Sequence, residues 1–204
     1  LNKAEANMGA GECGIFMTGI GGTGVVTVNQ ILGTAALLDG KHVHGLDQTG
    51  LSQKGGPVVS HLKISNAPWQ VSNKVAAGEA DCYLGFDILV ATNPQNLDRA
   101  RPERTVAIVS TSQVPTGAMV AFTEVEFPES NGLISSINRV TRKDENVYLD
   151  AIGLAEALFN DHMAANMILL GAAYQAGVIP VSADAIEHAI ALNGVAVQMN
   201  TQAF

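Results

Sequence analysis

Six residues, Gly19-Ile20-Gly21-Gly22-Thr23-Gly24, form the clearest chemical pattern in the sequence. They fit the spacing G-x-G-x-x-G and lie between an apolar run and a segment with helical periodicity. Glycines at these positions permit a tight turn and a close approach of a ligand to the backbone, and the N-terminus of the following helix favours an anion. The pattern predicts a turn that binds a phosphate-bearing ligand. The alternative is that the glycines serve only to pack the helix against its strand.

The connection from Asp47 to Pro57 is a second candidate for function. Its sequence is Asp-Gln-Thr-Gly-Leu-Ser-Gln-Lys-Gly-Gly-Pro, which is rich in turn formers and lacks helical periodicity. This composition predicts a long loop without secondary structure of its own, and such loops are often functional. Its hydroxyls, amides, carboxylate and ammonium group could hold a polar ligand or contact a neighbouring subunit. The alternative is a solvent-exposed connection whose glycines serve turns.

Asp47 also bears on which ligand the glycine turn could take. A dinucleotide site needs an acidic residue about 20 residues beyond the glycines, at the end of the second strand. Asp47 lies near that position, but a glycine-rich loop follows it where a Rossmann fold has a crossover helix. A free-standing NAD(P)-dependent dehydrogenase is therefore the weaker hypothesis. A non-catalytic assembly domain, whose turn binds no ligand, is a further alternative.

Hydrophobic periodicity indicates the elements that would position these residues. Apolar runs predict strands at 13–18, 42–46, 58–64, 82–85, 105–109 and 147–151. Helical spacing predicts helices at 22–38, 133–143, 154–159, 162–176 and 183–192, with one more that restarts at 93–94. Residues 88–91 fit either a helix or a strand. The pattern predicts a single α/β, Rossmann-like domain at 13–204, with a mostly parallel sheet, helices on both faces and a helical C-terminal part. Residues 1–12 are expected to be a lead-in or linker.

Composition excludes several classes of protein. The 204 residues are 47% hydrophobic, which excludes a disordered chain, and the net charge of −8 argues against a non-specific nucleic-acid binder. Only 15% of the residues are charged, which suggests a fragment whose surface is partly covered by partner domains. No signal segment or membrane helix is expected.

Titratable side chains outside the two candidate segments suggest structural roles. Cys13 and Cys82 lie in apolar strands, so we expect core residues and neither a disulfide framework nor a four-thiolate metal site. The histidines show no metal-ligand spacing. Asp81 and Asp87 flank a predicted strand and are expected to be solvated. No catalytic residue and no metal ligand is predicted.

Three motifs in order resemble the gamma domain of 2-oxoacid:ferredoxin oxidoreductases. They are the glycine turn, the loop that ends Lys54-Gly55-Gly56 before a strand closing Leu62-Lys63-Ile64-Ser65, and the later Asn166-Met167-Ile168-Leu169-Leu170-Gly171-Ala172. The loop has Lys54 where many gamma subunits have arginine, and this version is similar to the fused indolepyruvate-type enzymes. The resemblance covers roughly residues 13–204.

The resemblance implies a part of a larger enzyme. Such enzymes decarboxylate a 2-oxoacid on thiamine diphosphate with magnesium, pass electrons through iron–sulfur clusters to ferredoxin, and release an acyl-CoA. The cofactors would be held mainly by other domains or subunits, while this domain covers the active site and helps to hold coenzyme A. The domain alone would be inactive, and the expected compartment is the cytoplasm, without nucleic-acid or membrane partners.

Carried over position by position, the resemblance implies two sets of site residues. The phosphate-type turn comprises Gly19, Gly21, Gly22, Thr23 and Gly24, and the loop that faces substrate or coenzyme A contributes Asp47, Thr49, Gln53, Lys54, Gly55 and Gly56. Lysine in place of the usual arginine loses bidentate recognition and leaves a point charge. Asn166 is expected to be a helix-packing amide, because the small residues after Leu170 suggest tight helix contact.

Overall fold

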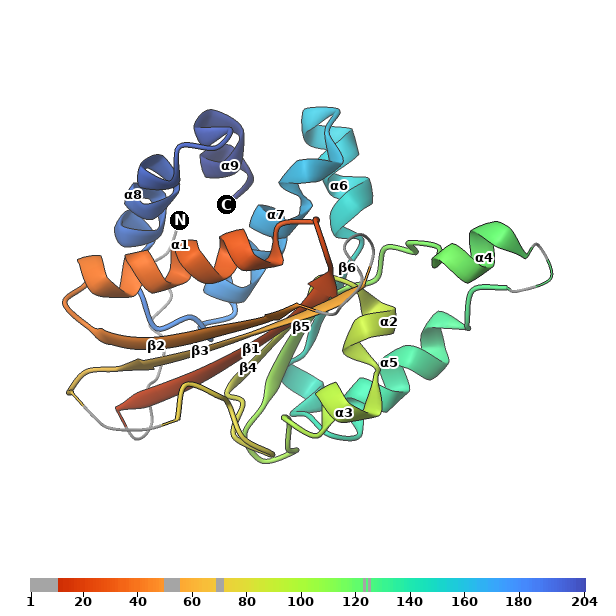
Figure 1. Ribbon diagram of the computed structural model, residues 1–204, viewed down its shortest axis with the longest axis horizontal. Helices are drawn as coiled ribbons and strands as arrows, with labels where there is room; N and C mark the ends of the chain where they lie inside the picture. Colours follow the sequence, from red (N-terminus) through yellow and green to blue (C-terminus); the bar gives the residue numbers. More distant parts are fainter. Residues whose placement is uncertain (1–10, 50–55, 69–71, 123, 125) are drawn as a thin grey trace.

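The computed structural model describes residues 11–49, 56–68, 72–122, 124 and 126–204, and Figure 1 shows their arrangement. Its strands are β1 (Glu12–Ile20), β2 (His42–Thr49), β3 (Pro57–Ser65), β4 (Cys82–Gly85), β5 (Val106–Ser110) and β6 (Val147–Leu149). Its α-helices are α1 (Val25–Leu38), α2 (Ile88–Ala91), α3 (Pro94–Leu97), α4 (Gly117–Ala121), α5 (Ser130–Asn138), α6 (Ala151–Phe159), α7 (Ala165–Gln175), α8 (Ala183–Asn193) and α9 (Val197–Ala203). Two short 3₁₀ turns, η1 (Lys143–Glu145) and η2 (His162–Ala164), complete the described elements.

The strands form one sheet in the order β2-β3-β1-β4-β5-β6. Strands β1, β4, β5 and β6 pair in parallel, whereas β3 runs antiparallel to both β1 and β2. The predicted fold class, an α/β domain with a mostly parallel sheet, is confirmed. The reversal at β3 follows from chain length, because the link after Thr49 is too short for the crossover that a parallel neighbour needs.

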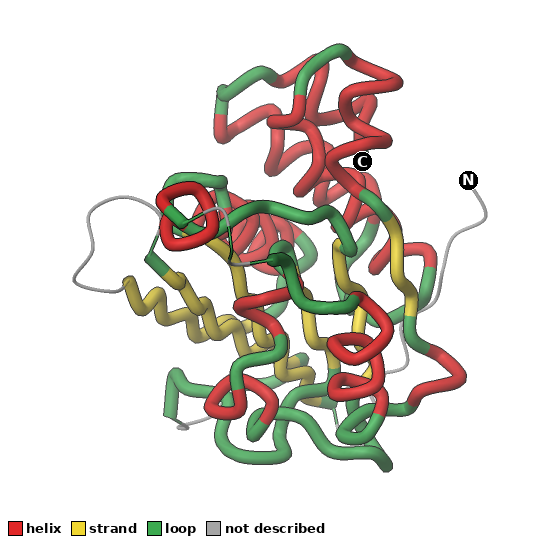
Figure 2. The backbone as a smooth tube through the Cα atoms, turned by 90° about the vertical axis from the view of Figure 1, so that its right-hand side faces the viewer, coloured by secondary structure: helices red, strands yellow, loops and turns green. Residues whose placement is uncertain are grey.

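Both faces of the central strands are buried, which explains their continuous apolar runs. In β1, Ile15 and Met17 pack into a core with α1, α7 and α8, whereas Phe16 faces a second core on the other side. The same alternation occurs in β4, where Leu84 joins the first core and Tyr83 the second. The sheet is therefore covered by helices on both faces, as Figure 1 shows with α1 above and α2 and α5 below. Figure 2, turned by 90°, shows the C-terminal helices gathered together at one end of the molecule.

Two polar clusters fix the helices and the sheet. The carboxylate of Asp39, after the last turn of α1, accepts hydrogen bonds from Ser182 N at 2.6 Å and Ser182 Oγ at 2.8 Å, so it joins α1 to the N-cap of α8. On the opposite face of the sheet, His61 is only 2% exposed. Its Nδ1 accepts from Val75 N at 3.1 Å, so its Nε2 carries the hydrogen that faces Gln48 Oε1 at 3.1 Å. Burial, followed by nearby cations, lowers the pKa of His61 to about 4.

The structure corrects some predicted boundaries. Strand β2 continues through Asp47, Gln48 and Thr49, so the prediction that the loop begins at Asp47 is wrong. These residues are exposed on an edge strand and are not apolar, which is why hydrophobic periodicity missed them. Residues 88–91, which fitted either element, form helix α2, and the predicted helix at 133–143 is α5, which ends at Asn138. The short helices α4 and α9 were not predicted. Most of the proposed lead-in lies outside the described residues, and its last residue, Glu12, begins β1.

Candidate functional site

The glycine turn follows β1, at the point in the sheet where the connections after two neighbouring strands lie on opposite faces. From β1 the chain passes through α1 on one face of the sheet, and from the neighbouring β4 it passes through α2 on the other face. In open α/β sheets, ligands bind in the crevice that such a divergence leaves at the carboxyl ends of the strands. The segments that follow β1 and β4 are therefore the place to look for a site.

The glycines of the turn have different structural roles. A Cβ on Gly19 would lie 2.6 Å from Val25 Cγ2, so this glycine lets α1 pack against β1. Gly22 and Gly24 have φ of +87° and +96°, which side-chain-bearing residues rarely adopt. A Cβ on Gly22 would meet nothing within 4 Å, so that position faces open space. The packing role predicted as an alternative thus applies to Gly19, while Gly22 shapes a surface on which a ligand could lie.

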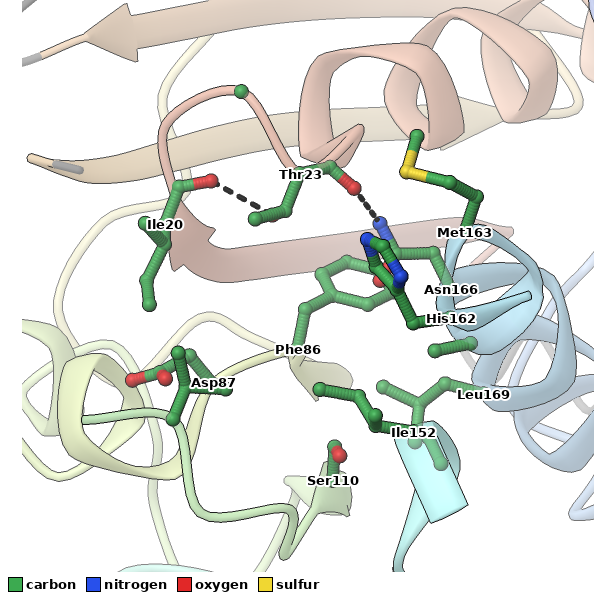
Figure 3. Close-up of a pocket in the computed structure, with 14 residues that line it drawn as sticks. Ile20, Thr23, Phe86, Asp87, Ser110, Ile152, His162, Met163, Asn166 and Leu169 are labelled. Carbon is green, nitrogen blue, oxygen red and sulfur yellow. Dashed lines mark hydrogen bonds between the residues drawn. The ribbon is translucent and has the colours of Figure 1, made fainter. Parts of the chain in front are cut away.

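Four hydrogen bonds hold the turn, one of them from Thr23 N to Ile20 O at 3.3 Å. Gly21 N donates to Gly56 O at 2.7 Å, which ties the turn to the residue before β3. Thr23 Oγ1 donates to Ile20 O at 2.7 Å across the turn. The amide of Asn166, on α7, donates from Nδ2 to Thr23 O at 2.6 Å (Figure 3). The expected role of Asn166 as a helix-packing amide is therefore corrected, because its partner is the backbone of the turn.

The first turn of α1 leaves donors available to an anion. The first hydrogen bond within the helix runs from Val28 N to Gly24 O, so the amides of the three residues before Val28 have no partner inside the helix. The N-cap residue Gly24 supplies no side chain to cap them, and this turn of the helix has no acidic residue. The dipole of the fourteen-residue helix adds positive potential at the same end. This arrangement suits a phosphate or a carboxylate.

Two cavities adjoin the turn. The larger, about 560 Å³, lies over the start of α1 and is lined by Ile20, Gly21, Gly22, Gly24, Val25, Val26, Thr27, Thr49, Val58 and Met163. The smaller, about 120 Å³, lies in the crevice between the turn and the end of β4. Its walls are mainly apolar, from residues such as Ile20, Phe86, Val114, Ile152 and Leu169, and its polar members are Thr23, Asp87, Ser110, His162 and Asn166 (Figure 3). Ile20, Gly22 and Met163 line both cavities, so the two spaces meet at the turn.

Asp87 and Asp81 differ from their predicted solvated state. Asp87 is 3% exposed and caps α2 by accepting from Val90 N at 2.8 Å, while its Oδ2 has no partner among the described residues. Burial raises the pKa of Asp87, against the hydrogen bonds from the α2 amides. Asp81 is half-buried and receives Arg104 Nε at 2.6 Å, Arg104 Nη2 at 2.7 Å and Gly14 N at 2.7 Å. Asp87 thus caps α2, whereas Asp81 joins the start of β4 to β1 and to Arg104.

The other predicted site residues divide into two groups. Asp47 Oδ1 accepts from Asn29 Nδ2 at 2.8 Å and from Ser60 Oγ at 2.5 Å, so it takes part in joining α1 to the sheet. Thr49 lines the larger cavity with the glycines of the turn. The predicted residues Gln53, Lys54 and Gly55 lie outside the described residues.

Residues that could hold an iron–sulfur cluster or a magnesium diphosphate do not occur in the described ranges. Cys13 and Cys82 are both buried within the sheet, and burial raises the pKa of each thiol. The thiolate that a metal requires is therefore disfavoured at both positions. Within the same ranges, no three His, Cys, Asp or Glu side chains cluster in a way that could hold a metal ion. The described residues do not fit these groups, whereas the glycine turn offers backbone N–H donors that suit an anion.

Sequence reasoning missed several residues of the crevice, namely Phe86, Ser110, Ile152, His162 and Met163. They come from four separate elements or connections and have no mutual spacing in the sequence. A signal did exist for two of them. Phe86 and Ser110 stand at the carboxyl ends of predicted strands, and in a parallel sheet those ends meet at one edge.

Comparison with known proteins gives the family. The family model for pyruvate ferredoxin/flavodoxin oxidoreductase matches residues 14–204, and the chain belongs to this family. A subunit of indolepyruvate oxidoreductase, IorB from Pyrococcus horikoshii, is 28% identical over 199 residues, which are 95% of this chain and 93% of that protein. The IorB subunit from Archaeoglobus fulgidus is 25% identical and is covered to 83%. The resemblance to the gamma domains of this family is thereby confirmed.

Solved structures share the fold. Pyruvate oxidoreductase subunit PORC from Thermotoga maritima superposes with a TM-score of 0.65 at 17% identity, covering 94% of this chain and 92% of that one. The 2-oxoglutarate:ferredoxin oxidoreductase from Magnetococcus marinus, with 2-oxoglutarate, coenzyme A and succinyl-CoA bound, gives 0.67 at 17% identity. The match covers 95% of this chain and 30% of that longer one, so there the same fold forms part of a larger polypeptide.

Proposed function

We propose that this chain is the gamma-type domain of an indolepyruvate-like 2-oxoacid:ferredoxin oxidoreductase, and that its glycine turn holds the phosphates of coenzyme A. The observation that carries the proposal is the meeting of the two cavities at the turn, at Ile20, Gly22 and Met163. Family membership and the names of the relatives support the reaction class.

The shapes of the two cavities suit an elongated ligand with an anionic group and a slender arm. The first three residues of α1, whose amides have no partner inside the helix, line the larger cavity, where phosphates would be stabilised by N–H donors and by the helix dipole. The smaller cavity is narrow and mainly apolar, and it suits the thiol-bearing pantetheine arm. Thr23 and Asn166 lie at its wall and offer polar contacts to amides of that arm.

The redox chemistry would take place outside this domain. In the full enzyme, thiamine diphosphate with magnesium would supply decarboxylation, and iron–sulfur clusters would carry electrons to ferredoxin, with both held by partner domains or subunits. This chain would cover that active site and present coenzyme A to the acyl group. The domain by itself is then inactive, and a cytoplasmic location agrees with a ferredoxin-linked reaction. Among the described residues, no helix is long and apolar enough to cross a membrane.

A nicotinamide cofactor finds less support from the geometry. In a dinucleotide site the acid that binds the ribose stands on the strand next to the glycine turn. Here β3 lies between β1 and β2, so Asp47 is one strand further from the turn. Its Oδ1 is also engaged by Asn29 and Ser60. An assembly domain without a ligand remains the alternative that the experiment must separate.

The test starts with the native enzyme that contains this chain, isolated anaerobically and assayed for iron, thiamine diphosphate and CoA-dependent, 2-oxoacid-dependent reduction. The informative variant is Gly22→Ala, which adds a methyl group where a ligand would lie and strains a backbone with φ of +87°. We expect the KM for coenzyme A to rise about tenfold, which corresponds to roughly 1.4 kcal/mol of lost binding, with thiamine diphosphate content unchanged.

Gly132→Ala is the matched control, because its Cβ would also meet nothing within 4 Å and its position is helical. This variant should leave the KM for coenzyme A unchanged. A preparation without thiamine diphosphate and without oxoacid-dependent reduction would remove the proposed reaction. An active enzyme in which Gly22→Ala leaves the KM for coenzyme A unchanged would instead remove the glycine turn from coenzyme A binding.

A further inference from the structure

The segment between β5 and α5 projects away from the body of the molecule, as Figure 1 shows for α4. We call the described residues 113–122, 124 and 126–129 the α4 arm. Its helix is held by local bonds, from Met119 N to Thr116 Oγ1 at 3.3 Å and from Val120 N to Thr116 O at 3.0 Å. Helix α4 makes no extensive contact with any other element in the described part of the chain.

The base of the arm, in contrast, is anchored on both sides. Val114 lines the smaller cavity, and Phe127 packs against the core beneath the sheet. Gln113 Nε2 donates to Ser130 Oγ at 3.4 Å and joins the two ends. The arm is therefore fixed where it leaves the domain, and its tip is presented outward at the edge of the sheet that carries the glycine turn.

The tip is apolar although it faces solvent. Val120 is 73% exposed and Phe122 is 56% exposed. Exposed apolar side chains that stand singly need no explanation, but here two lie close together, on a helix without extensive contacts to the other described elements and just after its C-terminal end. Aromatic side chains such as Phe122 are enriched in protein interfaces.

The charges of the arm indicate what kind of surface would receive it. Its three charged residues, Glu124, Glu126 and Glu129, are all acidic and exposed, and the arm has no lysine or arginine. A complementary surface would present an apolar pocket with a rim of basic side chains. This chain carries a net charge of −8, which disfavours a second copy of it as the partner of an acidic arm.

We infer that the α4 arm docks onto a neighbouring chain or domain of the same enzyme complex, with Val120 and Phe122 in an apolar pocket rimmed by lysine and arginine. The inference rests on the proposed function in one respect, namely that a multi-component oxidoreductase supplies the neighbour. Because Val114 belongs both to the arm and to the crevice, docking would place that neighbour beside the smaller cavity. The arm would then orient the proposed coenzyme A site relative to the rest of the enzyme.

Site-specific photo-crosslinking in the assembled native complex tests the inference. The photoreactive residue p-benzoylphenylalanine replaces Val120, and the same residue at Leu37, which is 61% exposed at the end of α1, serves as the matched control. Crosslinked peptides are identified by mass spectrometry. We expect the probe at 120 to label a peptide outside these 204 residues that contains apolar side chains next to lysine or arginine.

The charge of the arm is tested in the same assay. The double change Glu124→Lys with Glu126→Lys should lower the crosslink yield from position 120 by about tenfold, because basic residues would then face a basic rim. Glu103→Lys is the control, since Glu103 is exposed just before β5, at the opposite end of that strand from the arm.

Three outcomes would overturn the inference: no crosslink from position 120, a crosslink to a second copy of this chain, or a yield that the double change leaves unaltered. The failure of the proposed function is recognised separately. Thiamine diphosphate content of the same preparation decides the reaction, whereas the identity of the crosslinked peptide decides the docking.

Discussion

The bond from Asn166 to the glycine turn can be removed with little other change by Asn166→Ala. Its Nδ2 donates to Thr23 O at 2.6 Å, and the side chain is half-buried. A neutral hydrogen bond of this kind contributes about 1 kcal/mol net, and a carbonyl that faces a cavity can be hydrated once the amide is gone. For a domain of this size, a loss of about 1 kcal/mol lowers the Tm by roughly 2–4 °C.

Asn166→Ala should also weaken the binding of coenzyme A, by more than the loss of about 1 kcal/mol in the free energy of unfolding would cause by itself. Thr23 O is fixed by Asn166, and the amides that follow it face the larger cavity. Without the bond, binding of coenzyme A has to order the turn, and we expect the KM for coenzyme A to rise about five- to tenfold, which corresponds to roughly 1 kcal/mol. The assay is steady-state, oxoacid-dependent reduction by the assembled enzyme at varied coenzyme A, together with thermal unfolding.

Gln175→Ala supplies the control, because Gln175 is an exposed residue on the same helix. It should change the free energy of unfolding by less than about 0.5 kcal/mol and leave the KM for coenzyme A unaltered. A variant Asn166→Ala that lowers the Tm by the expected amount but keeps the KM for coenzyme A would refute the reasoning, since the amide would then only join α7 to the turn.

Three further changes test the packing that supports the site. His61→Gln should flatten the dependence of stability on pH, because the pKa of His61 is about 4 in the folded chain and near 6.5 when unfolded. As the pH falls from 6.5 to 4, the free energy of unfolding of the wild type, measured with urea, should therefore fall by about 3 kcal/mol more than that of the variant. Asp39→Ala removes both bonds to Ser182 and should lower the free energy of unfolding by about 1–2 kcal/mol, whereas equal denaturation midpoints would show the link to be unimportant. Gly171→Ala places a Cβ against Phe204 O and should destabilise by about 1–3 kcal/mol, with loss of protection from hydrogen exchange in α9; unchanged exchange would contradict the contact.

Local pattern was sufficient to predict much of the fold. Buried strands such as β1 and β4 are continuous apolar runs because helices cover both faces, and α1 shows its periodicity because one side faces the sheet. The turn between β1 and α1 was predictable because positive φ at Gly22 and Gly24 and close packing at Gly19 require glycine.

What the sequence did not reveal depends on contacts between distant segments. The direction of β3 depends on the length of the link before it, which periodicity does not report. Asn166 and Thr23 are separated by 143 positions, so only the tertiary fold shows that they bond. Asp87 was predicted to be solvated because it follows a strand. In the structure its carboxylate accepts a hydrogen bond from Val90 N, and the side chain points into the protein and is buried. The last three residues of the edge strand β2, Asp47 to Thr49, are polar and exposed, so their pattern could not be distinguished from a loop.

The reversed strand β3 also constrains the order in which the chain can assemble during synthesis. Strands β2 and β3 pair through nearby residues, with Thr49 opposite Val58, and such local pairing has a small loop-closure entropy. Strand β1 is made first, yet its partners are β3, up to Ser65, and β4, up to Gly85. Its apolar residues therefore remain unpaired for several seconds at a synthesis rate of about 5–20 residues per second. Strand β1, which carries the glycine turn, is thus the strand whose exposure lasts longest on the ribosome, and it is where a chaperone would be most needed.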